Sequence, residues 1–437
     1  MSRAMKDSGI PWIGEIPEGW KVCFIKQIMR NKSIKGFPNE RVLSLYRDYG
    51  VIPKDSRDDN HNVTSDDTSS YKLVDEGDFV INKMKAWQGS MAVSEYRGII
   101  SPAYYICRFT STDINKRYIH YLLRNDSYKT EYMRLSSGLR VGQWDLNIDD
   151  FLRIMMILPP LAEQQRIAEF LDRKCAEVDE MIALQEQIIE ELKAYKQSVI
   201  TEAVTKGLNP DVPMKDSGIE WIGEIPEHWE VCRVKDILEA GKDGIKIGPF
   251  GSSLTNKVNG DGECKIYGQW NIVNKDFTAG KNFVSAETYK ELDAYKIVAG
   301  DILVSMMGTI GKCAIIPNGL QDGIMDSHVI KIRINKSTIN PEYFELMYDK
   351  DNSTFIFEQL SRMKKGSIMD GLNSSIVKRL NLLLPPIDEQ QEIVSYLLEK
   401  RSKIESLISI KLSKIDSLKE YKKSIIYEYV TGKREVE

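Results

Sequence analysis

The feature that most constrains this chain is an internal repeat. Residues 5–17 read MKDSGIPWIGEIP and residues 214–226 read MKDSGIEWIGEIP, which differ at one position. A second pair follows, because LPPLAEQQ at 158–165 returns as LPPIDEQQ at 384–391. The offsets are 209 and 226 residues, so the chain is one unit written twice, with a longer second interior. Such a period is far above the roughly 20 to 50 residues of solenoid repeats, and it predicts a duplicated molecule with an approximate internal two-fold.

Each unit closes with a segment that is predicted to form a long helix. Two prolines precede each segment, and acidic residues follow in the first turn: Glu163 in one, Asp388 and Glu389 in the other. Proline suits the first helical position, and acids suit the positive helix start. Gly207 and Gly432 mark the expected helix ends. Each helix then has about 45 residues and is roughly 65 Å long.

Apolar residues recur along both segments at steps of three and four, which is the pattern of a coiled coil. Polar residues interrupt the pattern at matching places, Lys174 with Lys400 and Gln185 with Lys411, and such breaks can fix register. A long helix with one apolar stripe needs a partner, and an internal two-fold makes the two helices antiparallel. The predicted packing positions are Ile167, Leu171, Val178, Met181, Ile188, Leu192, Tyr195, Val199, Ile393, Leu397, Ile404, Leu407, Leu418, Tyr421 and Ile425.

Two other interpretations of the repeat remain open. Each helix could instead pack on its own neighbouring domain, and the duplication could serve stability alone. Charge favours pairing of the helices, because residues 159–213 hold 11 acidic and 6 basic side chains while residues 385–437 hold 10 of each. The differences between the halves also gather in the interiors, which duplication for stability would not explain.

The interiors are predicted to be mixed α/β domains. Short apolar runs between turn signals predict strands at 77–82, 104–109, 300–305 and 328–334. Helices are expected near 116–133 and 341–360. The fold class is therefore α+β, with two mixed domains separated by two long helices that form an antiparallel coiled coil. The predicted boundaries are 1–157 for the first domain, 158–213 for the first helical spacer, 214–383 for the second domain and 384–437 for the second spacer.

No motif for catalysis or metal binding stands out. A phosphate-binding loop needs G-x-x-x-x-G-K-[ST], and residues 308–313 (GTIGKC) have glycines too close together and a cysteine in place of the hydroxyl. The four histidines are isolated, without metal-ligand spacing. No G-x-S-x-G elbow marks a catalytic serine. The sequence therefore predicts a binding or scaffold protein with no metal and no cofactor of its own.

Composition limits the class of protein and the compartment in which it works. With 42% hydrophobic and 28% charged residues, the chain is globular rather than disordered. Its densest apolar run, 154–158, is far short of the ~20 residues that span a bilayer. The first residues lack the apolar core of a secretory signal, and six cysteines show no paired spacing. We expect a cytoplasmic protein without membrane contact. The net charge of −4 indicates that the chain alone does not bind phosphates tightly.

With its two divergent interiors, each followed by a long helix that opens on LPPLAEQQRI or LPPIDEQQEI, the chain resembles the specificity subunit of type I restriction-modification enzymes. The resemblance covers essentially the whole chain. Three further runs resemble elements of that family's target recognition domains. They are DFVINKMKAWQG at 78–89, KIGPFGSSL at 246–254 and DILVSMMGTIGK at 301–312.

The resemblance implies a non-catalytic, DNA-binding subunit. Two target recognition domains would each read one half of an asymmetric, bipartite site in double-stranded DNA. The paired helices would set the gap between the halves and dock two methyltransferase subunits, which restriction subunits join. S-adenosylmethionine for adenine N6 methylation, and ATP and Mg for translocation and cleavage, would belong to those partner subunits.

Candidate DNA contacts follow from how bases are read. Arg, Lys, Asn and Gln make two-pronged bonds to base edges in the major groove, so polar residues in glycine-containing stretches are the candidates. For each of them the alternative is a solvated surface residue or, for tryptophan, a core position. The first domain offers Lys83, Lys85, Trp87, Gln88, Arg140, Gln143 and Trp144. The second domain offers Lys246, Ser252, Ser253, Gln269, Asn271, Thr309, Lys312, Lys364, Lys365 and Ser367.

The repeated Trp-Ile-Gly of 12–14 and 221–223 cannot encode different targets, and we expect it to pack each domain against the helices. Two rival functions remain. One is a coiled-coil scaffold that does not bind DNA, and the other is a self-contained DNA-modifying enzyme. Loss of complex-dependent site recognition after exchange of residues 214–384 would exclude the scaffold. Methylation of DNA by the purified chain alone would support the enzyme.

Overall fold

The computed structural model describes residues 3–47, 49–57, 64, 67–138, 144–241, 244–249, 254, 258, 262–308, 310–349, 351–363 and 372–436. The chain divides into two compact units, one made of residues 1–186 and 412–437 and the other of residues 187–411. Each unit therefore contains one globular domain, part of one long helix and part of the other.

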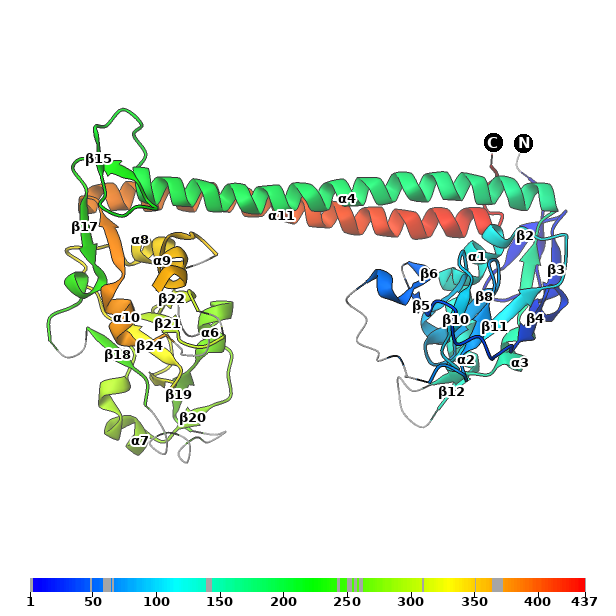
Figure 1. Ribbon diagram of the computed structural model, residues 1–437, viewed down its shortest axis with the longest axis horizontal. Helices are drawn as coiled ribbons and strands as arrows, with labels where there is room; N and C mark the ends of the chain where they lie inside the picture. Colours follow the sequence, from blue (N-terminus) through cyan, green and yellow to red (C-terminus); the bar gives the residue numbers. More distant parts are fainter. Residues whose placement is uncertain are drawn as a thin grey trace. The chain divides into compact units, whose positions relative to one another are not determined.

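The two long helices are α4, Leu161–Lys206, and α11, Ile387–Val430 (Figure 1). Their lengths of 46 and 44 residues confirm the predicted long helices. Helix α4 stops one residue before Gly207 and α11 stops two residues before Gly432, and both glycines have positive φ, 76° and 70°. Glycine adopts this left-handed conformation without a Cβ penalty, so it ends the helix where the sequence placed it.

Within each unit the two helices run antiparallel. In the first unit the ring of Phe170 lies 4.4 Å from that of Tyr429, and the Lys422 ammonium donates to the Asp179 carboxylate at 2.6 Å. Residue numbers increase along α4 where they decrease along α11, so the two helices run in opposite directions. In the second unit the end of α4 and the start of α11 share one hydrophobic cluster, which includes Ile200 and Ile393.

The seam between the helices differs from the predicted one. Met181, Tyr195, Leu407 and Tyr421 were predicted to pack, but their exposed fractions lie between 46% and 53%. The residue that follows each of these four is half-buried instead. Buried positions along the two helices include Ile167, Leu171, Cys175, Val178, Gln185, Ile189, Ile200, Ile393, Leu397, Ile404, Ile415, Ile425 and Tyr429. From Leu171 to Ile189 their spacing fits steps of four and three, which is a heptad repeat.

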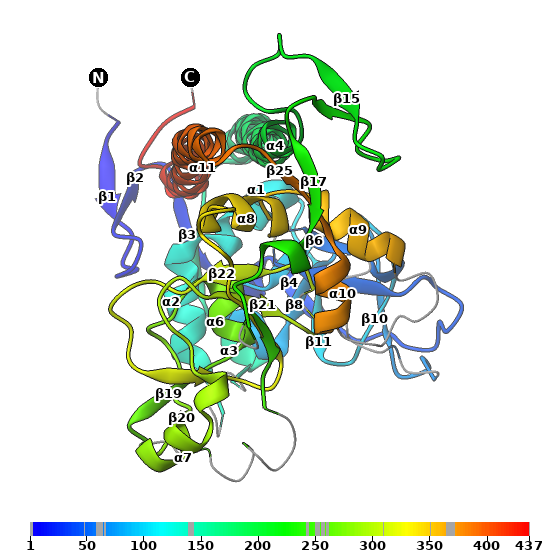
Figure 2. The same ribbon diagram turned by 90° about the vertical axis from the view of Figure 1, so that its left-hand side faces the viewer.

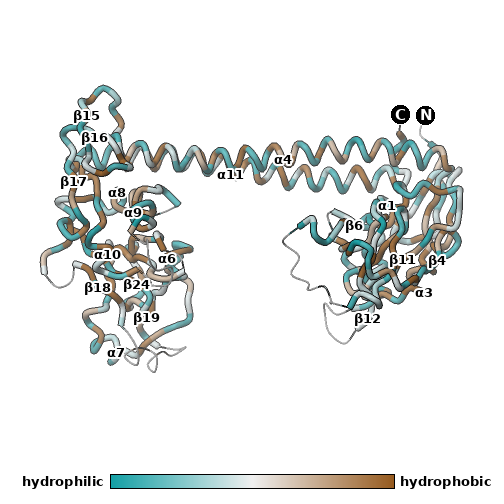
Figure 3. Tube along the Cα trace, viewed as in Figure 1, coloured by the Kyte–Doolittle hydropathy of each residue, from teal (hydrophilic) through white to brown (hydrophobic). Residues whose placement is uncertain are grey.

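Ile188, Leu192, Val199 and Leu418 are half-buried beside this seam. Gln185 is buried in it, and its Oε1 has no hydrogen-bond partner among the described residues. A buried amide oxygen without a partner lowers the stability of the fold, so Gln185 destabilises the helix pair. Teal and brown segments alternate along both helices in Figure 3, as expected for helices with one apolar side.

The domain of the first unit is built around a four-stranded antiparallel sheet of order β4-β11-β8-β9. The described residues of this unit also form the two-stranded sheets β1-β2, β3-β14, β5-β6, β7-β10 and β12-β13. The strands of this unit are β1 Met5–Asp7, β2 Glu15–Pro17, β3 Lys21–Phe24, β4 Met29–Lys32, β5 Leu43–Tyr46, β6 Gly50–Pro53, β7 Lys72–Val74, β8 Phe79–Asn82, β9 Met91–Val93, β10 Gly98–Ile100, β11 Tyr104–Phe109, β12 Ser136–Ser137, β13 Asp145–Leu146 and β14 Met155–Leu158. Its helices are α1 Lys116–Arg124, α2 Asp126–Leu135 and α3 Ile148–Leu152.

The domain of the second unit repeats the central sheet, with order β18-β24-β21-β22. It adds a three-stranded sheet, β20-β19-β23, in which β19 and β23 are parallel. Figure 2 shows β17 beside β25, the pair that precedes α11. The strands are β15 Met214–Asp216, β16 Glu224–Pro226, β17 Glu230–Arg233, β18 Ile245–Ile247, β19 Cys264–Tyr267, β20 Phe283–Val284, β21 Ile302–Ser305, β22 Cys313–Ile315, β23 Gly323–Met325, β24 Val329–Ile332 and β25 Asn381–Leu384. The helices are α6 Gln269–Asn274, α7 Ala286–Glu291, α8 Pro341–Tyr348, α9 Phe355–Met363 and α10 Ser374–Arg379.

All four predicted strands exist, as β8, β11, β21 and β24. The predicted helix at 116–133 is instead two helices, because the Asn125 side chain accepts the Ser127 N–H and starts α2 as an N-cap. The predicted helix at 341–360 also breaks. Buried Asp349 accepts the backbone N–H of Asp351 and so ends α8 in a turn.

Candidate nucleic-acid interface

The central strand of each domain begins at the same kind of turn. Gly77 and Asp78 precede β8, and Gly300 and Asp301 precede β21, with positive φ at both glycines. Each aspartate is buried and accepts the backbone N–H three residues before it, at 2.9 Å for Asp78 and 2.8 Å for Asp301. The two domains therefore share a turn that anchors one end of the strand.

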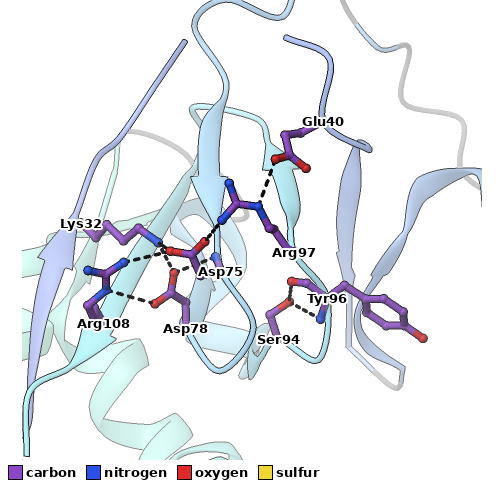
Figure 4. A network of polar contacts seen from close by, with 8 residues as sticks. All are labelled: Lys32, Glu40, Asp75, Asp78, Ser94, Tyr96, Arg97 and Arg108. Atoms are coloured by element: carbon purple, nitrogen blue, oxygen red, sulfur yellow. Dashed lines mark hydrogen bonds and ion pairs between the residues drawn. The ribbon is translucent and has the colours of Figure 1, made fainter. Parts of the chain in front are cut away.

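Ion pairs hold this turn in the first domain (Figure 4). The Lys32 ammonium lies 2.5 Å from Asp78 and 2.7 Å from Asp75, and Arg97 and Arg108 reach Asp75 at 2.6 and 2.9 Å. The hydrogen bond from Lys32 holds the pKa of Asp75 below its ordinary value against an opposing effect of burial, and the two arginines act in the same direction. The network ties β4, β11 and the turn together.

In the second domain, an arginine holds the corresponding turn. Arg333 donates to both carboxylate oxygens of Asp301, with Nε at 2.6 Å and Nη2 at 3.1 Å. Register places Arg333 where Arg108 stands in the first domain, since Leu303 faces Lys331 as Val80 faces Ile106. Both domains therefore anchor the start of this strand through a buried aspartate, with different partner side chains. The loop follows the opposite end of the strand.

In the first domain that loop carries four of the sequence candidates. Lys83, Lys85, Trp87 and Gln88 lie on a short 3-10 helix, Lys83–Gln88, directly after β8. The Lys83 ammonium lies 4.6 Å from the centre of a tyrosine ring, and Lys85 is exposed. Trp87 meets Trp144 edge-on at 5.6 Å between ring centres, so the structure brings these two candidates together. Arg140 and Gln143 lie outside the described residues.

Sequence reasoning missed a second group beside this loop. The Arg47 guanidinium donates to Gln88 Oε1 at 3.0 Å, and the Arg57 guanidinium lies 4.4 Å from the ring centre of exposed Tyr49. Arginine and tyrosine in contact form a flat, cationic surface that suits nucleic acid. The only signal in the sequence is R-D-Y-G at 47–50, a turn between two apolar runs.

In the second domain two candidates are engaged inside the fold. Gln269 Oε1 accepts the backbone N–H groups of both Met306 and Met307, at 3.1 and 2.9 Å. Buried Asn271 accepts the Gly268 N–H and donates to two carbonyl oxygens. Gln269 therefore holds the loop after β21, and the Asn271 amide holds its own turn.

The remaining candidates of the second domain lie apart from those two. Half-buried Lys246 stands on β18 with its ammonium 5.1 Å from the centre of the Tyr295 ring. Lys312 forms an ion pair with Asp351. Ser252, Ser253, Thr309, Lys364, Lys365 and Ser367 lie outside the described residues. As contacts to DNA, all of the candidates stay predictions.

The repeated Pro-Pro-x-x-Glu-Gln-Gln motif joins each domain to a long helix. Gln164 is fully buried: its Oε1 accepts the Asn115 N–H at 2.7 Å, and its Nε2 donates to the Asp113 and Pro159 carbonyls. In the second unit, Gln390 makes the same three hydrogen bonds. Asn115 caps α1, so a single amide fastens the start of α4 to the start of a domain helix.

Two further contacts complete each joint. Trp20 donates its indole N–H to the Glu163 carboxylate at 3.1 Å, and Trp229 donates to Glu389 at the same distance. Tyr118 donates its hydroxyl to the Val430 carbonyl at 3.0 Å, so the first domain also binds the end of α11. The repeated Trp-Ile-Gly residues were expected to pack each domain against the helices, and the clusters confirm this. Ile13 is buried in one cluster with residues of both long helices, and Trp221 and Ile222 pack against the corresponding cluster of the second unit.

The outer face of each helix carries exposed apolar residues in equivalent places. Met181 and Leu184 on α4 are 48% and 52% exposed, and Leu407 and Ile410 on α11 are 46% and 59% exposed. We call them the first and second apolar patches. Residues three apart share a helix face, and an offset of 226 residues relates the two patches. Each unit therefore presents the same kind of surface.

Among the described residues, no cluster of histidine, cysteine or acidic side chains is arranged to hold a metal ion. No helix in the described part of the chain is long and apolar enough to cross a membrane.

A family model described as the type I restriction modification DNA specificity domain matches residues 17–194 and 226–414. The two matches cover well over half of the chain, and each runs from a globular domain into a long helix. The chain belongs to this family. The chain thus contains two specificity domains in tandem, which agrees with the internal repeat.

Relatives agree with the family. The chain is 24% identical to the type I restriction enzyme MjaVIII specificity subunit of Methanocaldococcus jannaschii, over 96% of this chain and 93% of that protein. It is 25% identical to the EcoKI specificity subunit of Escherichia coli, over 63% of this chain and 56% of that protein.

Solved structures show the same fold. A chain described by the words "Structural basis underlying complex assembly and conformational transition of the type I R-M system" has a TM-score of 0.69 and 15% identity, over 95% of this chain and 98% of that one. The HsdS subunit from Thermoanaerobacter tengcongensis has a TM-score of 0.53 and 16% identity, over 96% and 98%. The architecture of two mixed domains and paired long helices is therefore that of known specificity subunits.

Proposed function

We propose that this chain is the DNA-reading subunit of a type I restriction-modification complex and that each globular domain reads one half of a bipartite site. The observation that carries the proposal is that the two domains share one backbone arrangement but carry different side chains on it. Both domains hold the same turn, central strand and loop, yet the side chains around the loops differ: Trp87 and Arg47 lie there in one domain and exposed Trp270 in the other. Unlike surfaces on like frames suit unlike half-sites.

The paired helices would act as the spacer between the half-sites. Gln164 and Gln390 fasten each helix start to a domain by three hydrogen bonds each, so a domain cannot rotate freely about its helix. A reader that is fixed to a rod holds its register on the duplex better than one on a flexible linker.

The two apolar patches support docking of two copies of one partner, which we propose to be the methyltransferase subunit. Equivalent surfaces on the two units offer each copy the same contact, and exposed apolar patches mark protein interaction sites. Restriction subunits would join that assembly. We further propose that this chain has no catalytic role, and that S-adenosylmethionine, ATP and Mg act in the partner subunits in the cytoplasm.

The partner subunits would also explain how a complex that contains this acidic chain binds DNA. A net charge of −4 does not favour phosphate binding, so the phosphate contacts that position the complex would come largely from the partner subunits. This chain would then supply the base contacts.

Domain exchange tests the proposal. Residues 20–155 are replaced by the matching domain of another specificity subunit, and the methylome of cells that express the complex is sequenced. The exchanged complex should methylate a site in which one half is new and the other half is unchanged. Exchange of residues 214–384 should change the other half, which serves as the reciprocal control. A change in both halves, or in neither, contradicts modular reading, and unchanged site recognition after both exchanges would favour a scaffold.

A further inference from the structure

Each domain presents one exposed methionine at the same place in its frame. Met84 follows β8 and is 48% exposed, and Met307 follows β21 and is 47% exposed. The residue before each methionine bonds back to the neighbouring strand: the Lys83 N–H to the Ala103 carbonyl at 3.2 Å, and the Met306 N–H to the His328 carbonyl at 3.1 Å. The two methionines are therefore structurally equivalent.

Different side chains hold the two methionines in the same way. The Met84 N–H donates to Asn82 Oδ1 at 3.1 Å, and the Met307 N–H donates to Gln269 Oε1 at 2.9 Å. Asn82 is the last residue of β8, whereas Gln269 comes from α6. An amide oxygen thus fixes the backbone of each methionine, although the two amides come from different elements, and the exposed apolar side chain stands on a rigid support.

The surroundings of the methionines indicate what they contact. Trp87 donates its indole N–H to the Met84 carbonyl at 3.1 Å, and Lys85 is exposed next to Met84. In the second domain, Trp270 follows Gln269 and is 56% exposed. An apolar tip with an aromatic neighbour and, in the first domain, an adjacent cation suits a stacked, phosphate-lined surface better than an apolar protein groove.

We propose that Met84 and Met307 are wedges that enter a base-pair step, one in each half of the DNA site. The inference rests on the proposed function. Because both domains carry the same residue, it cannot distinguish two half-sites and must make a contact that both need. Methionine is among the side chains that partly unstack a base step and bend the duplex, and its burial offsets the cost of unstacking. Trp87 and Gln269 are positioning residues for the wedges.

The test uses the full chain assembled with its methyltransferase subunits and a duplex of its own target, found by methylome sequencing. Met84→Ala and Met307→Ala are measured for affinity over a range of salt concentrations and for permanganate oxidation of unstacked thymines. Each variant should bind about tenfold more weakly, because a buried methionine contact is lost. The slope of log affinity against log salt should not change, since no phosphate contact is removed. Permanganate reactivity should fall in one half-site only, and in the other half-site for the other variant.

Matched control variants distinguish loss of the wedge from the general effect of removing an exposed methionine side chain. Met133→Ala and Met363→Ala remove methionines that are 49% and 48% exposed but lie on α2 and at the end of α9. These variants should bind as the wild type does. Equal affinity of all four variants, a change in salt slope, or loss of a methyltransferase copy from the Met84→Ala complex would overturn the wedge. If the wild-type complex recognises no bipartite site, the proposed function fails instead.

Discussion

Single buried residues carry the joints of this protein. The Gln164 amide uses its oxygen and its two N–H groups on three backbone groups of two segments, at 2.7, 2.9 and 3.2 Å. No other side chain offers a donor pair and an acceptor in that planar arrangement except asparagine, which is one methylene shorter. The repeated glutamine of the motif is thus explained by hydrogen-bond satisfaction rather than by chemistry.

Loss of this amide should be costly. Gln164→Ala leaves three backbone groups without this partner, of which the Pro159 carbonyl lies in a buried residue, and we expect about 3 kcal/mol of destabilisation in the first unit. Urea unfolding and hydrogen exchange of the α1 amides would measure it. Gln165→Ala is the control, because Gln165 is exposed and its amide donates to Glu169 on the same helix. Equal effects of the two substitutions would contradict the joint.

The ion network of the first domain predicts sensitivity to acid. Asp75 has a pKa below its ordinary value in the folded state, mainly through Lys32, so its contribution to stability is present above the ordinary value of about 4 and is lost as the pH falls through the lowered value. Asp75→Asn should therefore unfold at a lower temperature than the wild type at pH 7. The difference should start to shrink as the pH falls below about 4 and should vanish only below the lowered pKa of the folded state, where the wild-type carboxylate is neutral as well.

Thermal unfolding of both proteins from pH 7 to pH 3 checks this expectation. Asp55→Asn is the control, since its ion pair with Arg41 is exposed on both sides and should contribute little. A difference between wild type and Asp75→Asn that stays constant with pH would show that the carboxylate charge is not the cause.

At the scale of elements, α4 and α11 each have two roles on two faces. The seam buries heptad positions such as Val178 and Ile415, while Met181 and Leu407 face outward. Apolar residues stand next to each other at Met181–Ile182 and Ile188–Ile189, so one helix has two apolar stripes about 100° apart. One stripe packs on the partner helix, and the other stays exposed.

The outward stripe predicts the copy number of the partner. Met181→Glu with Leu184→Glu should remove one methyltransferase subunit from the assembled complex, because charge in an apolar contact is not compensated. Leu407→Glu with Ile410→Glu should remove the other, and all four substitutions together should remove both. Native mass spectrometry of the purified complex counts the copies. Gln187→Glu and Ser413→Glu change exposed polar positions and should leave two copies. Two copies on every variant would place the docking surface elsewhere.

At the scale of the whole molecule, the chain joins each domain to both long helices. The first domain binds the start of α4 through Gln164 and the end of α11 through Tyr118. The second binds the start of α11 through Gln390, and Tyr343 of α8 packs in one cluster with Val204 near the end of α4. Since each domain contacts both helices, a change in helix length acts on both domains.

Helix length should set the gap between half-sites. Insertion of seven residues into the middle of α4 and of α11 keeps the seam in phase, since it adds one heptad. The insertion adds about 10 Å to each helix, and the methylated halves should move apart by about three base pairs. Methylome sequencing measures the gap. A four-residue insertion shifts the seam and should lower stability, so it serves as the comparison. An unchanged gap with seven residues would refute the helices as the spacer.

Much of this protein is determined locally and could be predicted from sequence. The repeat predicts duplication, proline and glycine mark helix ends, and turn residues bound the four central strands, because each of these depends on a few neighbouring residues. The break at Asn125 shows the limit of that reasoning, since the same asparagine could sit in a helix or cap one.

Only the tertiary structure decided which of two apolar stripes faces the partner helix, what the buried glutamines bind, and which loop residues come together around Met84 and Met307. These outcomes depend on contacts between segments that lie far apart in the sequence, as Tyr118 and Val430 do at a separation of 312 residues. Local sequence makes several such contacts equally possible, and the packing of the whole unit selects among them, since a buried group must find its partner wherever the fold has brought one.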